Sequence, residues 1–362
     1  MLKTKTKISA IGTAVPKYVI PQSKVVDFMS KMMDVADEDK RKLRIIYKAS
    51  GIEERYSVID DYSKQDDFSF YNDDKNAPHP STSDRMKLYE EHAPELALEA
   101  ISDCLPVGFD VKTITHLITF SCTGMYAPGL DLDIVERLDL SSNISRTCIN
   151  FMGCYAAFNA IKAAYAFANA FSDAKVLIVG VELCTLHFQR FNEYDHIIAN
   201  SIFGDGAAAA IIEKTDQPGF SLEHFYHAIA FEGKSDMAWR IENTGFHMRL
   251  SSYVPKILKT NLTNVFEELF AELNTAQDKI DYFAIHPGGK KIVQAVEAAL
   301  DVQKNQISAT YDTLKDFGNM SSVSVLFVLK NMLNDLSVDN QNILAMAFGP
   351  GLTIEAALLK FE

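Results

Sequence analysis

The chain contains two copies of one pattern, and this repeat restricts its possible folds more than any other feature of the sequence. The apolar run at 116–124 ends in a polar residue and a glycine, and the run at 282–289 does the same. Each run is followed by a helical pattern and by further apolar runs. Continuous apolar runs are typical of strands that helices cover on both faces. We therefore predict a layered α/β fold with two similar halves, residues 1–214 and 215–362.

The repeat also brings particular polar residues into register. Cys122 precedes Cys154 by the same distance, to within one residue, as His286 precedes Asn319. Equivalent strand ends in two fused copies lie close together at the junction between the copies, which is a natural place for a ligand site. We therefore expect Cys154 of the first half to lie near His286 and Asn319 of the second.

Cys154 stands directly after a glycine and at the start of an alanine-rich segment. Alanine favours helix strongly, so a helix is predicted to start at or just before Cys154. The free N–H groups and the positive end of the helix dipole would then lower the pKa of the thiol. Most free cysteines, however, are small buried apolar residues, so the position alone does not identify a nucleophile.

Cysteine, histidine and asparagine together suit acyl-group chemistry. A protonated imidazole stabilises a thiolate nucleophile, and an imidazole N–H with an amide N–H can hold the oxyanion of a thioester enolate. A metal site formed by Cys122, Cys154, His187 and His286 is the alternative, but the sequence lacks closely spaced ligand pairs. We therefore predict no metal.

The charge and the cysteine usage exclude several classes of protein. The formal net charge of −13 argues against a nucleic-acid or anionic-membrane partner. Five cysteines show no disulfide framework, which indicates reduced thiols. The sequence begins with no apolar stretch long enough for a signal peptide, and no run approaches transmembrane length. We expect a cytoplasmic protein.

The remaining local patterns are less distinctive. A strand is predicted at 6–12, and Ser23 could cap a helix that starts near residue 24. The basic segment at 38–48 is either a solvated helix face or a binding site for phosphates. The polar stretch at 62–85 reads as a surface loop, and a helix is predicted at 92–103.

Several segments of the chain match a known family. They read RTCINFMGCYAAFNAIK, SIFGDGAAAAII, GFHMRLSSYVPKIL, AIHPGGKKIV, GNMSSVSVLFVL and AFGPGLTIE, and PSTSDRM is a further, looser match. Over nearly its whole length the chain resembles type III polyketide synthases, the chalcone synthase-like branch of the thiolase superfamily. The resemblance implies the thiolase fold, in which two equivalent halves form a layered αβαβα core.

The resemblance also implies an activity. Cys154 would accept a starter acyl group from coenzyme A, while His286 and Asn319 would promote decarboxylation of malonyl-CoA and stabilise the enolate. The family's two gating phenylalanines match Phe203 and Phe246. Coenzyme A thioesters are substrates in this family, no cofactor is implied, and the enzyme is expected to be a homodimer. The basic segment corresponds to the contacts with coenzyme A phosphates, for which the candidates are Lys42, Arg44 and Lys48.

Other positions match the residues that line the family's cavity and shape its product. They are Cys122, Thr123, Ala127, His187, Met237, Ser321 and Pro350. Ala127 replaces a larger residue that reaches into the partner subunit's cavity in the plant enzymes, whereas His187 and Met237 replace smaller ones. The resemblance therefore does not imply chalcone formation. Two alternatives stay open: a ketoacyl synthase III-like single condensation with acyl carrier protein, and a silent thiolase-fold partner in a complex.

Overall fold

The computed structural model describes residues 4–33, 36–74, 76–191, 193–250, 262, 265–335 and 340–362. Nine strands of this part of the chain form one sheet, in the order β11-β12-β13-β8-β1-β7-β6-β4-β5. The first half contributes β1 (Lys5–Ala14), β4 (His116–Ser121), β5 (Ser145–Asn150), β6 (Lys175–Leu183) and β7 (Asp205–Thr215). The second half contributes β8 (Phe220–Ile229), β11 (Tyr282–Ile285), β12 (Gln341–Gly349) and β13 (Thr353–Phe361).

The two halves of the sheet have the same topology. In the first half β4 is parallel to β6, and β6, β7 and β1 follow with antiparallel pairings. In the second half β11 is parallel to β12, and β12, β13 and β8 follow in the same way. The halves meet where β1 pairs with β8 through Lys7–Ser221 and Ile8–Phe220. The repeat predicted from the sequence is therefore confirmed as a structural duplication.

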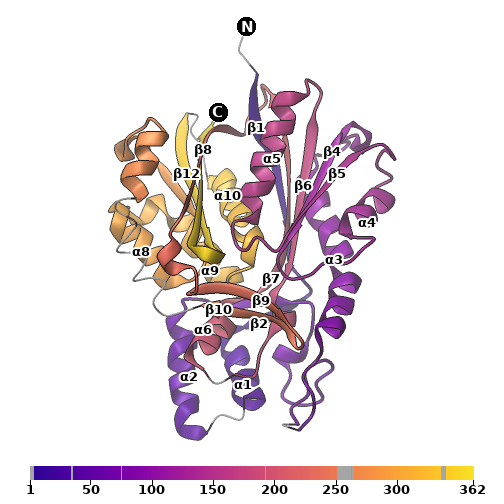
Figure 1. Cartoon of the computed structure of the whole chain (residues 1–362), viewed down its shortest axis with the longest axis vertical. Helices are drawn as coiled ribbons and strands as arrows, with labels where there is room; N and C mark the ends of the chain where they lie inside the picture. Colours follow the sequence, from indigo (N-terminus) through magenta and orange to yellow (C-terminus); the bar gives the residue numbers. More distant parts are fainter. Residues whose placement is uncertain are drawn as a thin grey trace.

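Helices cover the outer faces of both halves of the sheet, and two further helices pack between the halves. Figure 1 shows α5 (Ala156–Ala170) and α10 (Ser324–Asp335) in the middle of the molecule, and their apolar side chains share one buried cluster with both halves of the sheet. The outer layer beside the first half contains α3 (Thr82–Cys104) and α4 (Leu130–Arg137), while α1 (Gln22–Met32) lies at one end of the molecule and shares their buried apolar cluster. The outer layer beside the second half contains α8 (Lys290–Leu300) and α9 (Ser308–Phe317). This arrangement confirms the predicted thiolase fold.

Smaller elements gather at one end of the sheet. They are α2 (Asp37–Ala49), α6 (Tyr194–Ile202), the strand pair β2 (Tyr18–Pro21) and β3 (Glu54–Ser57), and the hairpin of β9 (Met237–Glu242) and β10 (Gly245–Leu250). The short 3₁₀ turns are η1 (Asp61–Ser63), η2 (Val111–Thr113), η3 (Cys184–His187), η4 (Phe231–Gly233), η5 (Gln277–Lys279), η6 (Lys304–Gln306), η7 (Ser321–Val323) and η8 (Pro350–Leu352). Figure 1 shows the β9–β10 hairpin crossing this end of the molecule, where the candidate site lies.

Three local predictions from the sequence are wrong. Helix α3 starts at Thr82, inside the stretch predicted as loop, because Ser81 and Asp84 form a capping box there. Helix α1 starts after Pro21, and Ser23 lies inside it and does not cap it. Helix α5 starts at Ala156, so Cys154 lies in the turn before the helix.

Candidate active site

Cys154 lies in a strained turn between β5 and α5. Phe151 and Gly153 both have left-handed backbone conformations in this turn, with φ of 62° and 92°. A Cβ atom on Gly153 would lie 2.1 Å from Cδ of Pro350, so only glycine fits there. The turn places Cys154 at the junction of the halves, with its side chain buried.

His286 and Asn319 come from turns of the second half. His286 directly follows β11, and its backbone N–H donates to Met346 O at 2.7 Å. Asn319 lies between α9 and α10, and its backbone N–H donates to Ile202 O at 2.8 Å. The same backbone forms an isolated bridge with Phe203, so the second half holds the segment that carries this phenylalanine.

One pocket brings the three residues together. This cysteine pocket is lined by Cys154, Phe203, Met237, Met248, His286, Gly288, Ile292, Asn319 and Phe348. Within the described residues, neither ring nitrogen of the buried His286 has a hydrogen-bond partner. Asn319 Oδ1 accepts from Ser321 N at 2.8 Å, and Asn319 Nδ2 makes only a long bond, 3.4 Å, to Gly288 O among the bonds found there. The imidazole and the amide therefore offer donors to a ligand beside the thiol.

Burial controls the ionisation of this site. It raises the pKa of Cys154 to about 12, with the Glu182 carboxylate as a further cause, and it lowers the pKa of His286 to about 3. Both groups are therefore neutral near pH 7 in this structure. The prediction that a helix start lowers the pKa of the thiol is wrong here, because α5 starts two residues later and desolvation dominates.

Glu182 is a buried residue of the site that the sequence analysis did not identify. Its carboxylate accepts from Cys122 N at 3.0 Å and from Thr123 Oγ1 at 2.6 Å in the first half. It also accepts from the N–H and the hydroxyl of Ser322 in the second half. Glu182 therefore ties the end of β4 to the turn that carries Asn319. A single glutamate near the end of an apolar strand is the only sequence signal for it.

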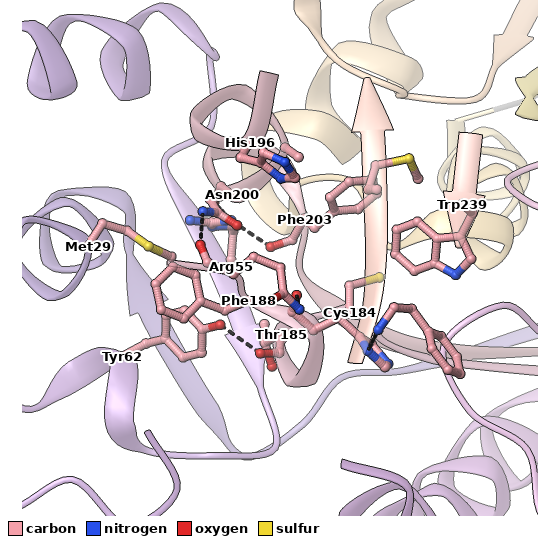
Figure 2. Close-up of a pocket in the computed structure, with 15 residues that line it drawn as sticks. Met29, Arg55, Tyr62, Cys184, Thr185, Phe188, His196, Asn200, Phe203 and Trp239 are labelled. Atoms are coloured by element: carbon pink, nitrogen blue, oxygen red, sulfur yellow. Dashed lines mark hydrogen bonds between the residues drawn. The ribbon is translucent and has the colours of Figure 1, made fainter. Parts of the chain in front are cut away.

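A second pocket adjoins the first across Phe203 and Met248, which line both. Figure 2 shows Trp239 at one end of this adjoining pocket and Met29 and Tyr62 at the other. Phe246 also lines it and is buried, with its ring centroid 6.3 Å from that of Trp239. The two predicted gate residues, Phe203 and Phe246, therefore both line the adjoining pocket, and Phe203 stands between the two pockets.

The structure separates the predicted cavity residues into groups. Met237 lines the cysteine pocket and His187 lines the adjoining pocket. Ser321 Oγ lies 3.9 Å from the Cys154 thiol. Neither Ser321 nor the other four predicted cavity residues line either pocket: Cys122 and Thr123 are buried behind the site, Pro350 packs against Gly153, and Ala127 is exposed.

The three basic candidates lie on α2, outside both pockets. Lys42, Arg44 and Lys48 have exposed side chains. Lys42 pairs with Asp39 at 2.6 Å, and Arg44 lies 3.9 Å from Asp27. A basic neighbour from the second half is Lys290 at the start of α8, which packs beside Gly51 just after α2.

The part of the chain that the structure describes contains no group of three or more histidine, cysteine, aspartate or glutamate side chains that could hold a metal ion. Among the same residues, no helix combines the length and the apolar character needed to cross a membrane.

The family models for the N-terminal and C-terminal domains of chalcone and stilbene synthases match residues 2–216 and 223–361. A relative, the alpha-pyrone synthesis polyketide synthase-like Pks18 of Mycobacterium tuberculosis, is 30% identical over 98% of this chain and 91% of its own length. Type III polyketide synthase A of Arabidopsis thaliana is 27% identical, over 98% of this chain and 93% of its own length.

Solved structures agree with these relatives. PKS-I from the brown alga Ectocarpus siliculosus superposes with a TM-score of 0.90 at 25% identity and covers 100% of both chains. The C-terminal type III polyketide synthase domain of Steely1 from Dictyostelium gives a TM-score of 0.89 at 27% identity and covers 99% of both chains. These likenesses support the polyketide synthase interpretation over a ketoacyl synthase III-like enzyme or a silent partner. The chain therefore belongs to the chalcone and stilbene synthase family and is a type III polyketide synthase.

Proposed function

We propose that the enzyme loads an acyl group from coenzyme A onto Cys154 and extends it with malonyl-CoA by decarboxylative Claisen condensation. The observation that carries this proposal is the buried imidazole of His286, whose two ring nitrogens have no partner among the described residues and which shares a pocket with Cys154 and Asn319. A buried polar group without a partner is costly unless a ligand satisfies it.

Loading begins with a proton transfer. Because the thiol and the imidazole are both neutral, His286 takes the Cys154 proton as the sulfur attacks the thioester carbonyl of the starter. The tetrahedral intermediate then expels coenzyme A as a thiolate, which recovers the proton from the imidazolium. Cys154 is left as an acyl thioester, and His286 is neutral again.

Decarboxylation uses the donors of His286 and Asn319. Their N–H groups would bind the thioester oxygen of malonyl-CoA, so the electron pair of the breaking carbon–carbon bond moves into an enolate as CO₂ leaves. A neutral imidazole is a suitable donor for this step because it does not protonate the enolate fully. The buried, largely apolar pocket also favours the change from a localised carboxylate to a delocalised enolate.

Condensation completes the cycle. The enolate carbon attacks the carbonyl of acyl-Cys154, the carbon–sulfur bond breaks, and the Cys154 thiolate leaves and takes up a proton from solvent, which restores the neutral thiol. The product is a β-ketoacyl-CoA two carbons longer, which can reload Cys154 for another extension. Lys42, Arg44 and Lys48 are proposed to contact the coenzyme A phosphates, and no metal or organic cofactor takes part in any step.

The test compares Cys154→Ala with His286→Ala. We expect Cys154→Ala to abolish chain extension but keep part of the malonyl-CoA decarboxylation, because His286 and Asn319 remain. His286→Ala is expected to lose decarboxylation by about 100-fold or more. Purified variants are incubated with malonyl-CoA and a panel of acyl-CoA starters, and CO₂ release and products are followed by mass spectrometry.

Cys104→Ala is the matched control, because this buried thiol lies in the outer layer away from both pockets. Polyketide formation by Cys154→Ala would refute the role of Cys154. Turnover of the wild-type enzyme with malonyl-acyl carrier protein but not with malonyl-CoA would refute the proposed extender.

A further inference from the structure

His187 makes a hydrogen bond through each of its ring nitrogens. Its Nε2 lies 2.6 Å from Thr123 O. A carbonyl oxygen only accepts, so Nε2 carries the proton and donates. In this tautomer Nδ1 carries a free lone pair, and it accepts a hydrogen bond from the backbone N–H of Phe246 at 3.0 Å. The imidazole therefore bridges the residues just beyond β4 and the first residues of β10.

This tautomer is stable in the folded protein. His187 is 6% exposed, and burial lowers its pKa to about 3. The ring is therefore neutral across the physiological range and keeps the acceptor that Phe246 uses.

The imidazole also packs against the side chain whose backbone it binds. The rings of His187 and Phe246 stack with centroids 4.4 Å apart and an interplanar angle of 12°. His187 thus restrains both the backbone and the ring of Phe246. A residue of the same size without nitrogen atoms could provide the ring contact only.

A second side chain attaches the same hairpin to the same place. Trp239 Nε1 on β9 donates to Cys122 O at 2.9 Å, and the carbonyl that His187 uses belongs to the next residue, Thr123. The β9–β10 hairpin is thus held at two successive carbonyls after β4, directly by Trp239 and through His187.

The hairpin forms walls of both pockets. Met237 and Met248 line the cysteine pocket, and Trp239, Phe246 and Met248 line the adjoining pocket. A displacement of the hairpin would therefore change the space next to Cys154 and the space beyond Phe203 together.

We propose that His187 is a positioning residue that clamps the β9–β10 hairpin to the residues after β4 through Phe246, and thereby limits the space into which the growing acyl chain extends. The effect on chain length rests on the proposed function. The clamp itself does not.

Three substitutions separate the clamp from simple filling of space. His187→Phe keeps the ring and the stacking but loses both hydrogen bonds. His187→Asn places an amide oxygen near the position of Nδ1, so it can still accept the Phe246 N–H. His187→Gln places an amide N–H near the position of Nε2, so it can still donate to Thr123 O but loses the bond to Phe246.

Trp239 is the only tryptophan of the chain, so its fluorescence reports on the hairpin alone. We expect acrylamide to quench Trp239 at least about twofold more strongly in His187→Phe and His187→Gln than in wild type, because the hairpin opens locally. His187→Asn should restore most of the protection. His247→Asn is the matched control: it is the same substitution next to Phe246, but His247 bonds to Thr244 Oγ1 on its own hairpin, and its quenching should equal that of wild type.

The same proteins are then given malonyl-CoA and short acyl-CoA starters, and the products are separated by mass. We expect His187→Phe and His187→Gln to shift at least about half of the product to chains with additional malonyl units, and His187→Asn to return it toward the wild-type distribution.

Equal quenching in wild type, His187→Phe and His187→Gln would refute the clamp. Changed quenching with unchanged product lengths would refute the effect on chain length. If the wild type forms no product from any starter, the proposed function fails, while the quenching result still decides the clamp. Should His187→Phe not fold, His187→Gln alone decides both parts.

Discussion

At the scale of single residues, desolvation determines the charge states of the site. Burial moves the pKa values of Cys154 and His286 in opposite directions, upward for the acid and downward for the base, and both shifts favour the neutral pair. Cys154 is therefore a neutral thiol, not a thiolate, in this state. In the proposed mechanism, the nucleophile forms only when Cys154 passes its proton to His286 during attack on the thioester.

The pH dependence of Cys154 alkylation tests this conclusion. A pKa of about 12 leaves the thiolate a minor species at every pH below it, and its fraction grows about tenfold for each pH unit. We expect the rate of alkylation by iodoacetamide to rise without a plateau from pH 6 to pH 9. The measurement is peptide mass spectrometry of the Cys154 peptide in the free enzyme. A plateau reached by pH 7 would show an ion pair with His286 and contradict the account.

The sequence predicts the main residues of the site but not their support. The register of the two halves predicts that Cys154 lies near His286 and Asn319, and the structure places all three around one pocket. Glu182 and Trp239 could not be predicted in the same way. Their roles depend on carbonyl and N–H groups that only the folded chain brings within reach.

At the scale of elements, the shape of the turn before α5 restricts which residues that turn can contain. Gly153 meets two separate restrictions, a φ of 92° and the contact with Pro350. The backbone of this turn and the backbone of η8 therefore cannot change conformation independently. A substitution that alters either one is expected to displace the Cys154 thiol.

Gly153→Ala tests this restriction, with Gly108→Ala as its matched control. Both glycines have left-handed φ values, but a Cβ on Gly108 would meet nothing within 4 Å. Gly108→Ala should cost about 1–2 kcal/mol of unfolding free energy and keep its activity. Gly153→Ala should lose about 100-fold or more in kcat, because the clash displaces Cys154. Urea unfolding and steady-state kinetics measure the two effects, and similar kinetics for both variants would contradict the argument.

The errors at this scale have physical causes. The predicted start of α3 is about ten residues too late. The stretch before Pro94 contains polar residues and prolines and therefore resembles a loop, and the Ser81–Asp84 capping box lies within it. The predicted start of α5 is two residues too early, because a high alanine content identifies a helical segment but does not fix its first residue.

At the scale of the whole molecule, duplication creates the site. Neither half contains the full set of proposed catalytic groups, since the thiol comes from one half and the imidazole and amide come from the other. The β1–β8 junction and Glu182 hold the halves in register. This level was the easiest to predict, because a repeat of strands and helices leaves a pattern over hundreds of residues.

We expect the outer edge of the first half to form the dimer surface. Strand β5 is the edge strand of the sheet, and Leu132 and Met152 beside it are each 39% exposed. We expect a homodimer, with Ala127 near the partner's cavity. Light scattering should give twice the chain mass of 40.4 kDa. The double variant Leu132→Arg/Met152→Arg should be monomeric, whereas Val107→Arg, at a fully exposed loop position, should stay dimeric. A monomeric wild type would exclude this surface as an interface.

The central claim is that one site built from both halves carries the acyl chain on Cys154. Its most direct test is peptide mapping by mass spectrometry after a brief incubation with a starter acyl-CoA. The account predicts an added acyl mass on the Cys154 peptide, which disappears on addition of malonyl-CoA as a longer product appears, and which His286→Ala forms far more slowly. An acyl group on Cys122, Cys148 or Cys184 instead, or product formation without any label on Cys154, would contradict it.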